Sequence, residues 1–183
     1  MDKKRGVLPP VEQNKPNWSL LRDPEQQAAR IELSDDDYAK QAYQFIDAVN
    51  LLLQNELQRI TTDGQSRADV FWQHNKMHRS THERGCYGTR VRLLNDYFIA
   101  EWYKNVFTKI LSDKPQSRYL AKGKDSLKYS KSCFKTANPL WEKALIEQIE
   151  QKYAELRAQA AIIYEIRKLL KRYRRLVDIT YGE

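Results

Sequence analysis

Apolar and polar positions between residues 35 and 60 alternate with the period of a helix face. Apolar side chains recur at three- and four-residue steps, and Ser34 ahead of an acidic first turn supplies an N-cap. The stretch 61–66, Thr-Thr-Asp-Gly-Gln-Ser, is a cluster of turn formers. We therefore expect one helix over about 35–60 that ends at this cluster, followed by a shorter helix or an irregular segment.

In the middle of the chain the spacing changes to that of strands. Residues 90–93 alternate polar and apolar, 95–96 is the turn-forming pair Asn-Asp, and 97–103 is rich in aromatic and branched side chains. This order predicts an antiparallel hairpin. A third strand at 106–111 and a turn at 122–125 complete the small antiparallel sheet of three or four strands that we expect.

The last part of the chain has the pattern of one long helix. Asn138 offers an N-cap and Pro139 the first helical position, and neither Gly nor Pro follows until Gly182. Apolar residues recur every seven positions from Ile149 to Val177. This spacing also suits a coiled-coil seam, but the alternate heptad positions include polar residues, so we expect the stripe to pack on this chain's own first helix and sheet.

These elements predict an α+β fold, in which a small antiparallel sheet packs against a helix near 35–60 and a long C-terminal helix near 139–176. Residues 1–33 lack sustained periodicity and contain Pro9-Pro10 and Pro16, so we interpret them as a flexible leader with a short helix at 24–32. We expect residues 34–183 to form a single α+β domain.

Composition narrows the class of protein. At 183 residues the chain fits one domain of ordinary size, and 31% of its residues are charged. No apolar run approaches 18 residues and no apolar segment follows the basic N-terminus, which predicts a cytoplasmic protein without a membrane span or a secretory signal. Cys86 and Cys133 lack a C-x-x-C spacing, so we expect free thiols.

The net charge of +8 is concentrated in one part of the chain. Residues 1–101 hold 14 Lys and Arg against 15 Asp and Glu, whereas residues 102–175 hold 18 against 7. Concentrated positive charge creates a surface potential that attracts polyanions. Nucleic acid is therefore the leading class of partner, and a solvated basic surface without a ligand is the alternative.

The end of the long helix carries six cations on one side. At 100° per residue they do not overlap with the apolar residues of the same stretch, which we expect to pack against the rest of the chain. Such a stripe can follow a phosphate backbone or bind an acidic protein. We predict that it binds nucleic acid through Arg167, Lys168, Lys171, Arg172, Arg174 and Arg175.

A second basic region is interleaved with aromatic residues. Cations that neutralise phosphates, beside rings that stack on bases, are typical of a nucleic-acid surface. The alternative is that the rings face the core. Because rings and arginine forks distinguish bases, we expect specificity to lie in the sheet and its surroundings. The predicted residues are Arg118, Lys122, Lys124, Lys128, Lys131, Tyr119 and Tyr129, together with the hairpin residues Arg90 and Arg92.

Neither a metal site nor an enzyme motif is predicted. His74, His78, His82 and Cys86 recur every four residues, but each helical turn moves the next ligand by about 5.4 Å, so one ion cannot collect all four. The chain has no phosphate-binding loop, no G-x-S-x-G and no H-E-x-x-H. We expect no cofactor, no metal and no catalytic residue.

From about Tyr87 to Tyr173 the sequence resembles the MobI family of conjugative transfer proteins. The segments that carry the resemblance are Ile99-Ala100-Glu101-Trp102-Tyr103, Ser117-Arg118-Tyr119-Leu120, 129–134, 150–157, 160–163 and 166–170. The resemblance implies an auxiliary factor of integrative conjugative elements and large mobilisable plasmids. Such a factor acts at the origin of transfer with a separate relaxase.

The sequence thus predicts a non-enzymatic, DNA-binding accessory protein of conjugative transfer. Its expected partners are DNA and a relaxase, with no membrane, and the formation of a homodimer stays open. One alternative is a module that binds an acidic protein in a phage or plasmid regulatory system. A small nuclease is the less favoured alternative.

Overall fold

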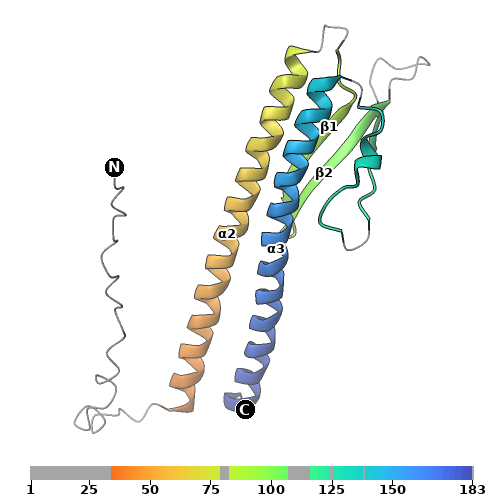
Figure 1. Cartoon of the computed structure of the whole chain (residues 1–183). Coiled ribbons are helices and arrows are strands. Elements are labelled where there is room, and N and C mark those ends of the chain that lie inside the picture. The colour runs from red at the N-terminus through yellow and green to blue at the C-terminus, as the bar shows by residue number, and fades with distance from the viewer. Residues whose placement is uncertain (1–33, 79–82, 107–115, 124–125, 138, 183) are drawn as a thin grey trace, which may run out of the picture. The chain divides into compact units, whose positions relative to one another are not determined.

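The computed structural model has the predicted α+β architecture, a three-stranded antiparallel sheet with two long helices (Figure 1). It describes residues 34–78, 83–106, 116–123, 126–137 and 139–182. The predicted leader, with its short helix at 24–32, lies outside the described residues, as does the predicted N-cap Asn138. The elements are α2 (Asp35–Met77), β1 (Tyr87–Leu94), β2 (Tyr97–Val106), β3 (Gln116–Tyr119), the short 3-10 helix η2 (Lys131–Phe134) and α3 (Leu140–Tyr181).

Helices α2 and α3 lie side by side and run antiparallel. Tyr38 near the start of α2 stacks on Tyr181 at the end of α3, with 6.4 Å between ring centroids. Further along the pair, Arg59 Nη2 donates to Gln159 Oε1 at 3.0 Å. The seven-residue stripe of α3 is buried, so the prediction that it packs within this chain is confirmed. Its members are Ile149, Leu156, Ile163, Leu170 and Val177.

The sheet is built on the predicted hairpin. Asn95 and Asp96 have φ angles of 48° and 62°, a left-handed pair that joins strands through a two-residue turn. Leu94 pairs with Tyr97 across that turn, and β3 then pairs with β2 in the order β1-β2-β3. Of the third strand expected at 106–111, Val106 is the end of β2 and the remainder lies outside the described residues.

The prediction that the first helix ends at 61–66 is wrong, because α2 continues without a break to Met77. Thr61 and Thr62 turn their hydroxyls back onto the carbonyls of Leu57 and Gln58, at 2.8 and 3.0 Å. A Cβ on Gly64 would lie 3.0 Å from a methyl group of Val91, so this glycine is where the sheet approaches the helix. Residue types that usually form turns are therefore accommodated within α2, and Gly64 allows the sheet to pack closely against the helix.

The hairpin covers only part of the helix pair (Figure 1). Its turn meets α3 at Arg167, whose Nη1 lies 3.5 Å from Asp96 Oδ2. Between Arg167 and the end of α3, the two helices contact each other. There the Tyr43 hydroxyl of α2 donates to Asp178 Oδ1 of α3 at 2.7 Å. We call this part, residues 35–52 and 162–181, the helical arm. Among the described residues, neither this arm nor any other helix combines the length and apolar character that a membrane crossing requires.

Candidate nucleic-acid interface

The six predicted cations of α3 lie on the helical arm and differ in their surroundings. Arg167 pairs with Asp96 of the hairpin turn, and Lys168 Nζ lies 2.7 Å from Glu165 Oε1. The Arg174 guanidinium lies over the ring of Tyr43, 5.5 Å from its centroid. The other three are exposed and pair with no carboxylate among the residues that the structure describes. These three are Lys171, Arg172 and Arg175.

Two adjoining hollows lie where the hairpin turn meets the arm. One, of about 350 Å³, is lined by the three cations Arg167, Lys171 and Arg174 and by polar residues of α2. The other, of about 250 Å³, is bounded by residues 95–97 of the turn and shares Arg167 and Lys171 with the first. We call the two together the hairpin-tip groove. It converts part of the predicted stripe into a concave cationic surface.

The apolar side of the same helix does not pack as predicted. Leu170 and Val177 are buried against α2, but Ile166, Leu169, Tyr173 and Leu176 remain substantially exposed. The prediction was wrong for these four residues because the sheet ends at the hairpin turn. Beyond it α2 is the only described element beside α3, and one helix cannot cover so wide an apolar face.

Tyr97 is a candidate that the sequence interpretation missed. It lies at the hairpin tip, is 60% exposed and borders the groove beside Lys168 and Lys171. Its ring lies 5.0 Å from that of Tyr164, whose hydroxyl accepts the Phe98 N–H at 2.6 Å. An exposed ring held among cations can stack on an unpaired base. Only the folded hairpin brings Tyr97 to the basic helix, so no local sequence signal marks it.

The hairpin arginines lie on the face of the sheet that turns away from the helices. Both contact Glu101 Oε1, Arg90 from 3.4 Å and Arg92 from 3.3 Å. Tyr119 is half exposed and packs on Tyr103, with 5.5 Å between ring centroids. The structure therefore gathers Arg90, Arg92 and Tyr119 on one outer face, whereas Arg118 is exposed on the edge strand β3.

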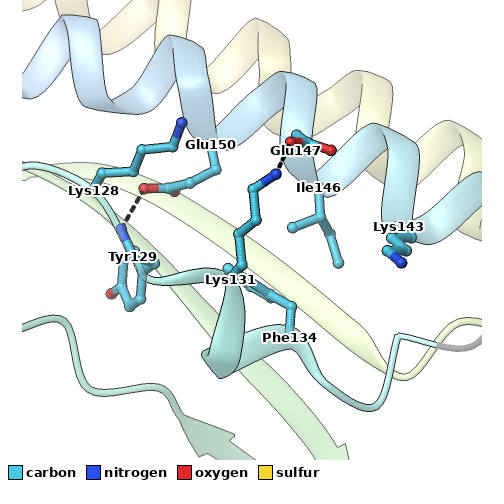
Figure 2. A pocket seen from close by; sticks show the side chains of 8 residues that line it. All are labelled: Lys128, Tyr129, Lys131, Phe134, Lys143, Ile146, Glu147 and Glu150. Carbon is cyan, nitrogen blue, oxygen red and sulfur yellow. Dashed lines mark hydrogen bonds and ion pairs between the residues drawn. The ribbon is translucent and has the colours of Figure 1, made fainter.

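Two of the remaining predicted lysines, Lys128 and Lys131, line a separate pocket near the start of α3 (Figure 2). The pocket holds about 100 Å³ between Lys128, Lys131 and Lys143, with Phe134 and Ile146 as its apolar lining. Lys131 Nζ contacts Glu147 Oε1 at 2.5 Å, and this hydrogen bond lowers the pKa of the Glu147 carboxyl. Lys128 Nζ likewise donates to Gln151 at 2.6 Å. These lysines are therefore partly engaged within the protein.

Tyr129 belongs to the core, which is the alternative that the sequence left open. Only 7% of the residue is exposed, its N–H donates to Glu150 Oε1 at 2.8 Å, and Arg157 lies 5.3 Å from its ring centroid. Its ring is not presented to a base. Lys122 donates to the Ser126 carbonyl, and Lys124 lies outside the described residues.

The structure does not bring the two basic regions together. Lys143 at the pocket and Lys171 at the hairpin-tip groove are 28 residues apart on one helix, which corresponds to about 42 Å along its axis. A ligand that touched both would have to extend along most of α3. The groove and the pocket are therefore separate candidate surfaces.

The histidine segment has a packing role in this structure. His78 stacks on Trp141 with 4.9 Å between ring centroids, and Trp141 Nε1 donates to the Glu83 carbonyl at 2.7 Å. Burial raises the pKa of the Cys86 thiol, which disfavours the thiolate that a metal requires. Within the described residues no group of three His, Cys, Asp or Glu could hold a metal ion, and His82 lies outside them.

A family comparison bears directly on this arrangement. The model of the family described as MobI protein matches residues 60–171, which is more than half of the chain. The chain belongs to the MobI family. MobI membership indicates a role in mobilisation, the conjugative transfer of DNA. The match starts earlier than the resemblance seen in the sequence and includes the histidine segment. No curated protein and no solved structure matches the chain significantly.

Proposed function

We propose that this MobI-family protein is a cytoplasmic DNA-binding accessory factor of conjugative transfer. It acts at the origin of transfer of an integrative conjugative element or mobilisable plasmid, and a separate relaxase cuts the DNA. The observation that carries the proposal is the hairpin-tip groove, in which Arg167, Lys171 and Arg174 converge on one concave surface. A phosphate backbone is the ligand that fits several cations at helical spacing, and Lys171 pairs with no carboxylate among the described residues.

In the groove, the carboxylate of Asp96 and an incoming phosphate can each bind Arg167, so the two compete for it. Asp96 is largely exposed and pairs with Arg167 at 3.5 Å, a distance longer than that of a close charge-assisted hydrogen bond. A phosphate entering the groove takes the place of Asp96 beside Arg167 and gains Lys171 as a second contact. Release of counterions from the DNA then supplies much of the binding free energy.

The outer face of the sheet is the proposed site of base recognition. Arginines 90 and 92 share one carboxylate, Glu101, which fixes their position and leaves them partly exposed. Arginine forks read guanine edges, whereas exposed rings such as Tyr97 and Tyr119 stack on bases that have left the duplex. We assign positioning of the backbone to the arm and discrimination among sequences to the sheet.

The test is the salt dependence of DNA affinity. In the variant Lys171→Gln/Arg174→Gln, which changes two cations that line the groove, loss of two phosphate contacts should lower the slope of log affinity against log salt by about 1.8. The control Lys40→Gln/Lys76→Gln removes the same charge from exposed positions of α2 outside the groove. The proposal predicts an unchanged slope for the control. Equal slopes for both variants would remove the hairpin-tip groove from the DNA site.

Two other results would favour the alternative functions, a module that binds an acidic protein and a nuclease. If origin DNA and random DNA both fail to bind at low salt, the basic surface serves an acidic protein partner. If supercoiled plasmid is cleaved in a metal-dependent manner by the purified protein, the chain is a nuclease. Affinity that falls steeply with salt, without cleavage, supports the proposed accessory role.

A further inference from the structure

In the part of the chain that the structure describes, an exposed apolar face extends along the helical arm. Eight large apolar side chains on it are each 38–66% exposed. Together they present an area on the order of several hundred Å², well beyond the scattered apolar residues of an ordinary surface. They are Tyr38, Phe45 and Leu52 of α2, and Ile162, Ile166, Leu169, Tyr173 and Leu176 of α3.

These side chains lie on one side of the helix pair. Phe45 and Tyr173 meet edge to face across it, with 6.0 Å between ring centroids. Tyr164 and Arg167 contact the hairpin, so Ile162 and Leu169, each two residues away, lie on the opposite side of α3. The apolar face therefore turns away from the sheet and from the hairpin-tip groove.

The spacing of the exposed residues indicates what kind of surface covers them. Tyr38, Phe45 and Leu52 are seven residues apart, as are Ile162, Leu169 and Leu176. They flank the buried stripes of the two helices. Two helices alone need only two apolar positions per heptad, whereas helices in a four-helix bundle use a third. The arm thus has the pattern of half a four-helix bundle.

We infer that this face joins the arm of a second copy of the chain, so that two helix pairs form a symmetric four-helix bundle. No charged residue lies among the eight apolar side chains on this arc of either helix, so the face offers no charge that would select a foreign partner. Because the apolar face is similar on both helices, the same face of two copies can pack together around a twofold axis. Its area approaches the roughly 800 Å² that each partner contributes to a standard interface.

The polar surroundings limit the contact to the arm. Beyond Leu52 the same side of α2 continues with Glu56 and Arg59, which pair at 2.7 Å. Next to them Lys152 of α3 lies between Asp63 and Glu155, at 3.8 and 3.6 Å. The apolar face ends at this ionic network, so the bundle has a defined length. The inference does not depend on DNA binding, because the groove lies on the other side of the pair.

A matched pair of variants of the full-length protein tests the dimer. Leu52→Gln/Leu169→Gln removes two apolar side chains from the face on each copy. Leu51→Gln/Ile179→Gln removes two comparably exposed side chains that lie on other sides of the same helices. Sedimentation equilibrium should show a wild-type dimer, and a dissociation constant raised by about a hundred-fold or more in the first variant only. Because all four positions are exposed in one copy, each variant should fold.

Three results of these solution measurements would overturn the inference. In the first, the wild type remains monomeric up to a concentration of about 100 μM. In the second, both variants dimerise with the same dissociation constant as the wild type. In the third, the wild type would bind vesicles of mixed neutral and anionic phospholipid and the face variant would not, which makes the face a membrane contact.

A photocrosslinking amino acid in place of Tyr173 identifies the occupant directly. When isotopically light and heavy chains are mixed, the expected crosslink joins residue 173 of one copy to the arm of the other. A crosslink from residue 173 to residues 1–33 of its own chain contradicts the dimer, because the leader would then cover the face.

Discussion

Arg157 and Glu150, two helical turns apart on α3, form a buried ion pair in which Nη1 lies 2.8 Å from Oε1. Glu150 also accepts the Trp102 indole N–H at 2.7 Å, and Arg157 donates to the Ala100 carbonyl at 2.8 Å. The pair thus connects the helix to β2. Because both charges are shielded from water, each depends on the other for compensation.

We predict that Arg157→Met destabilises the fold by about 3–5 kcal/mol, since it leaves the Glu150 carboxylate buried without a cation. Urea denaturation measures the free energy of unfolding. The control Lys131→Met removes one partner of the exposed Lys131–Glu147 pair, where water compensates the remaining charge, and should change stability little. Equal losses in the two variants would show that the buried pair has no special role.

Glu142 should make stability depend on pH. Burial raises the pKa of its carboxyl above the ordinary value of 4.5, although the Tyr87 N–H donates to it at 2.8 Å and opposes the shift. The folded protein therefore holds this proton more tightly than the unfolded chain. The stability that this group contributes is complete below pH 4.5 and is lost as the pH rises through the folded pKa.

Glu142→Gln keeps an acceptor for the Tyr87 N–H but cannot ionise. We expect its advantage over the wild type to grow as the pH rises above 4.5, as measured by thermal melts over a pH series. Glu147→Gln serves as a control of opposite sign, because Lys131 lowers the pKa of Glu147 and its contribution is lost as the pH falls. A constant difference between Glu142→Gln and the wild type would contradict the role of Glu142.

Gly64 should resist the substitution that normally stabilises a helix. Alanine gains about 1 kcal/mol over glycine inside a helix, but here its Cβ would lie 3.0 Å from Val91 and 3.1 Å from Phe98, both buried. We predict a net loss of stability for Gly64→Ala and a larger one for Gly64→Val. Gly123→Ala is the control, since the nearest described atom to its Cβ would be Ser126 Cβ at 3.7 Å. A stabilised Gly64→Ala protein would show that the sheet can move away.

The sequence predicted the parts of the fold that local chemistry determines. Asn95-Asp96 specifies a hairpin turn because these residue types tolerate positive φ, and the long run without Gly or Pro specifies α3. The stretch around Gly64 misled the prediction because its turn chemistry is overridden by contact with the sheet. Tyr97 and Tyr129 could not be sorted from sequence either: both are tyrosines next to lysines or strands, and only tertiary packing exposes one and buries the other.

These two tyrosines give the last prediction. Tyr97→Ala removes an exposed ring at the groove, so it should lower the affinity for single-stranded DNA by about 5- to 150-fold, the value of one stacked base. Duplex affinity, which depends on the cations, should fall much less. The melting temperature should stay close to that of the wild type. Fluorescence anisotropy with matched single-stranded and duplex oligonucleotides measures both affinities.

Tyr129→Ala is the contrasting variant, because its ring lies in the core against Arg157 and Phe134. It should lower the melting temperature and weaken binding to both DNAs alike, since removal of a large buried aromatic side chain costs about 3–5 kcal/mol. The comparison separates contact with DNA from support of the fold. If Tyr129→Ala instead reduced single-strand affinity alone, with an unchanged melting temperature, base stacking would have to be assigned to the lysine pocket rather than to the hairpin tip.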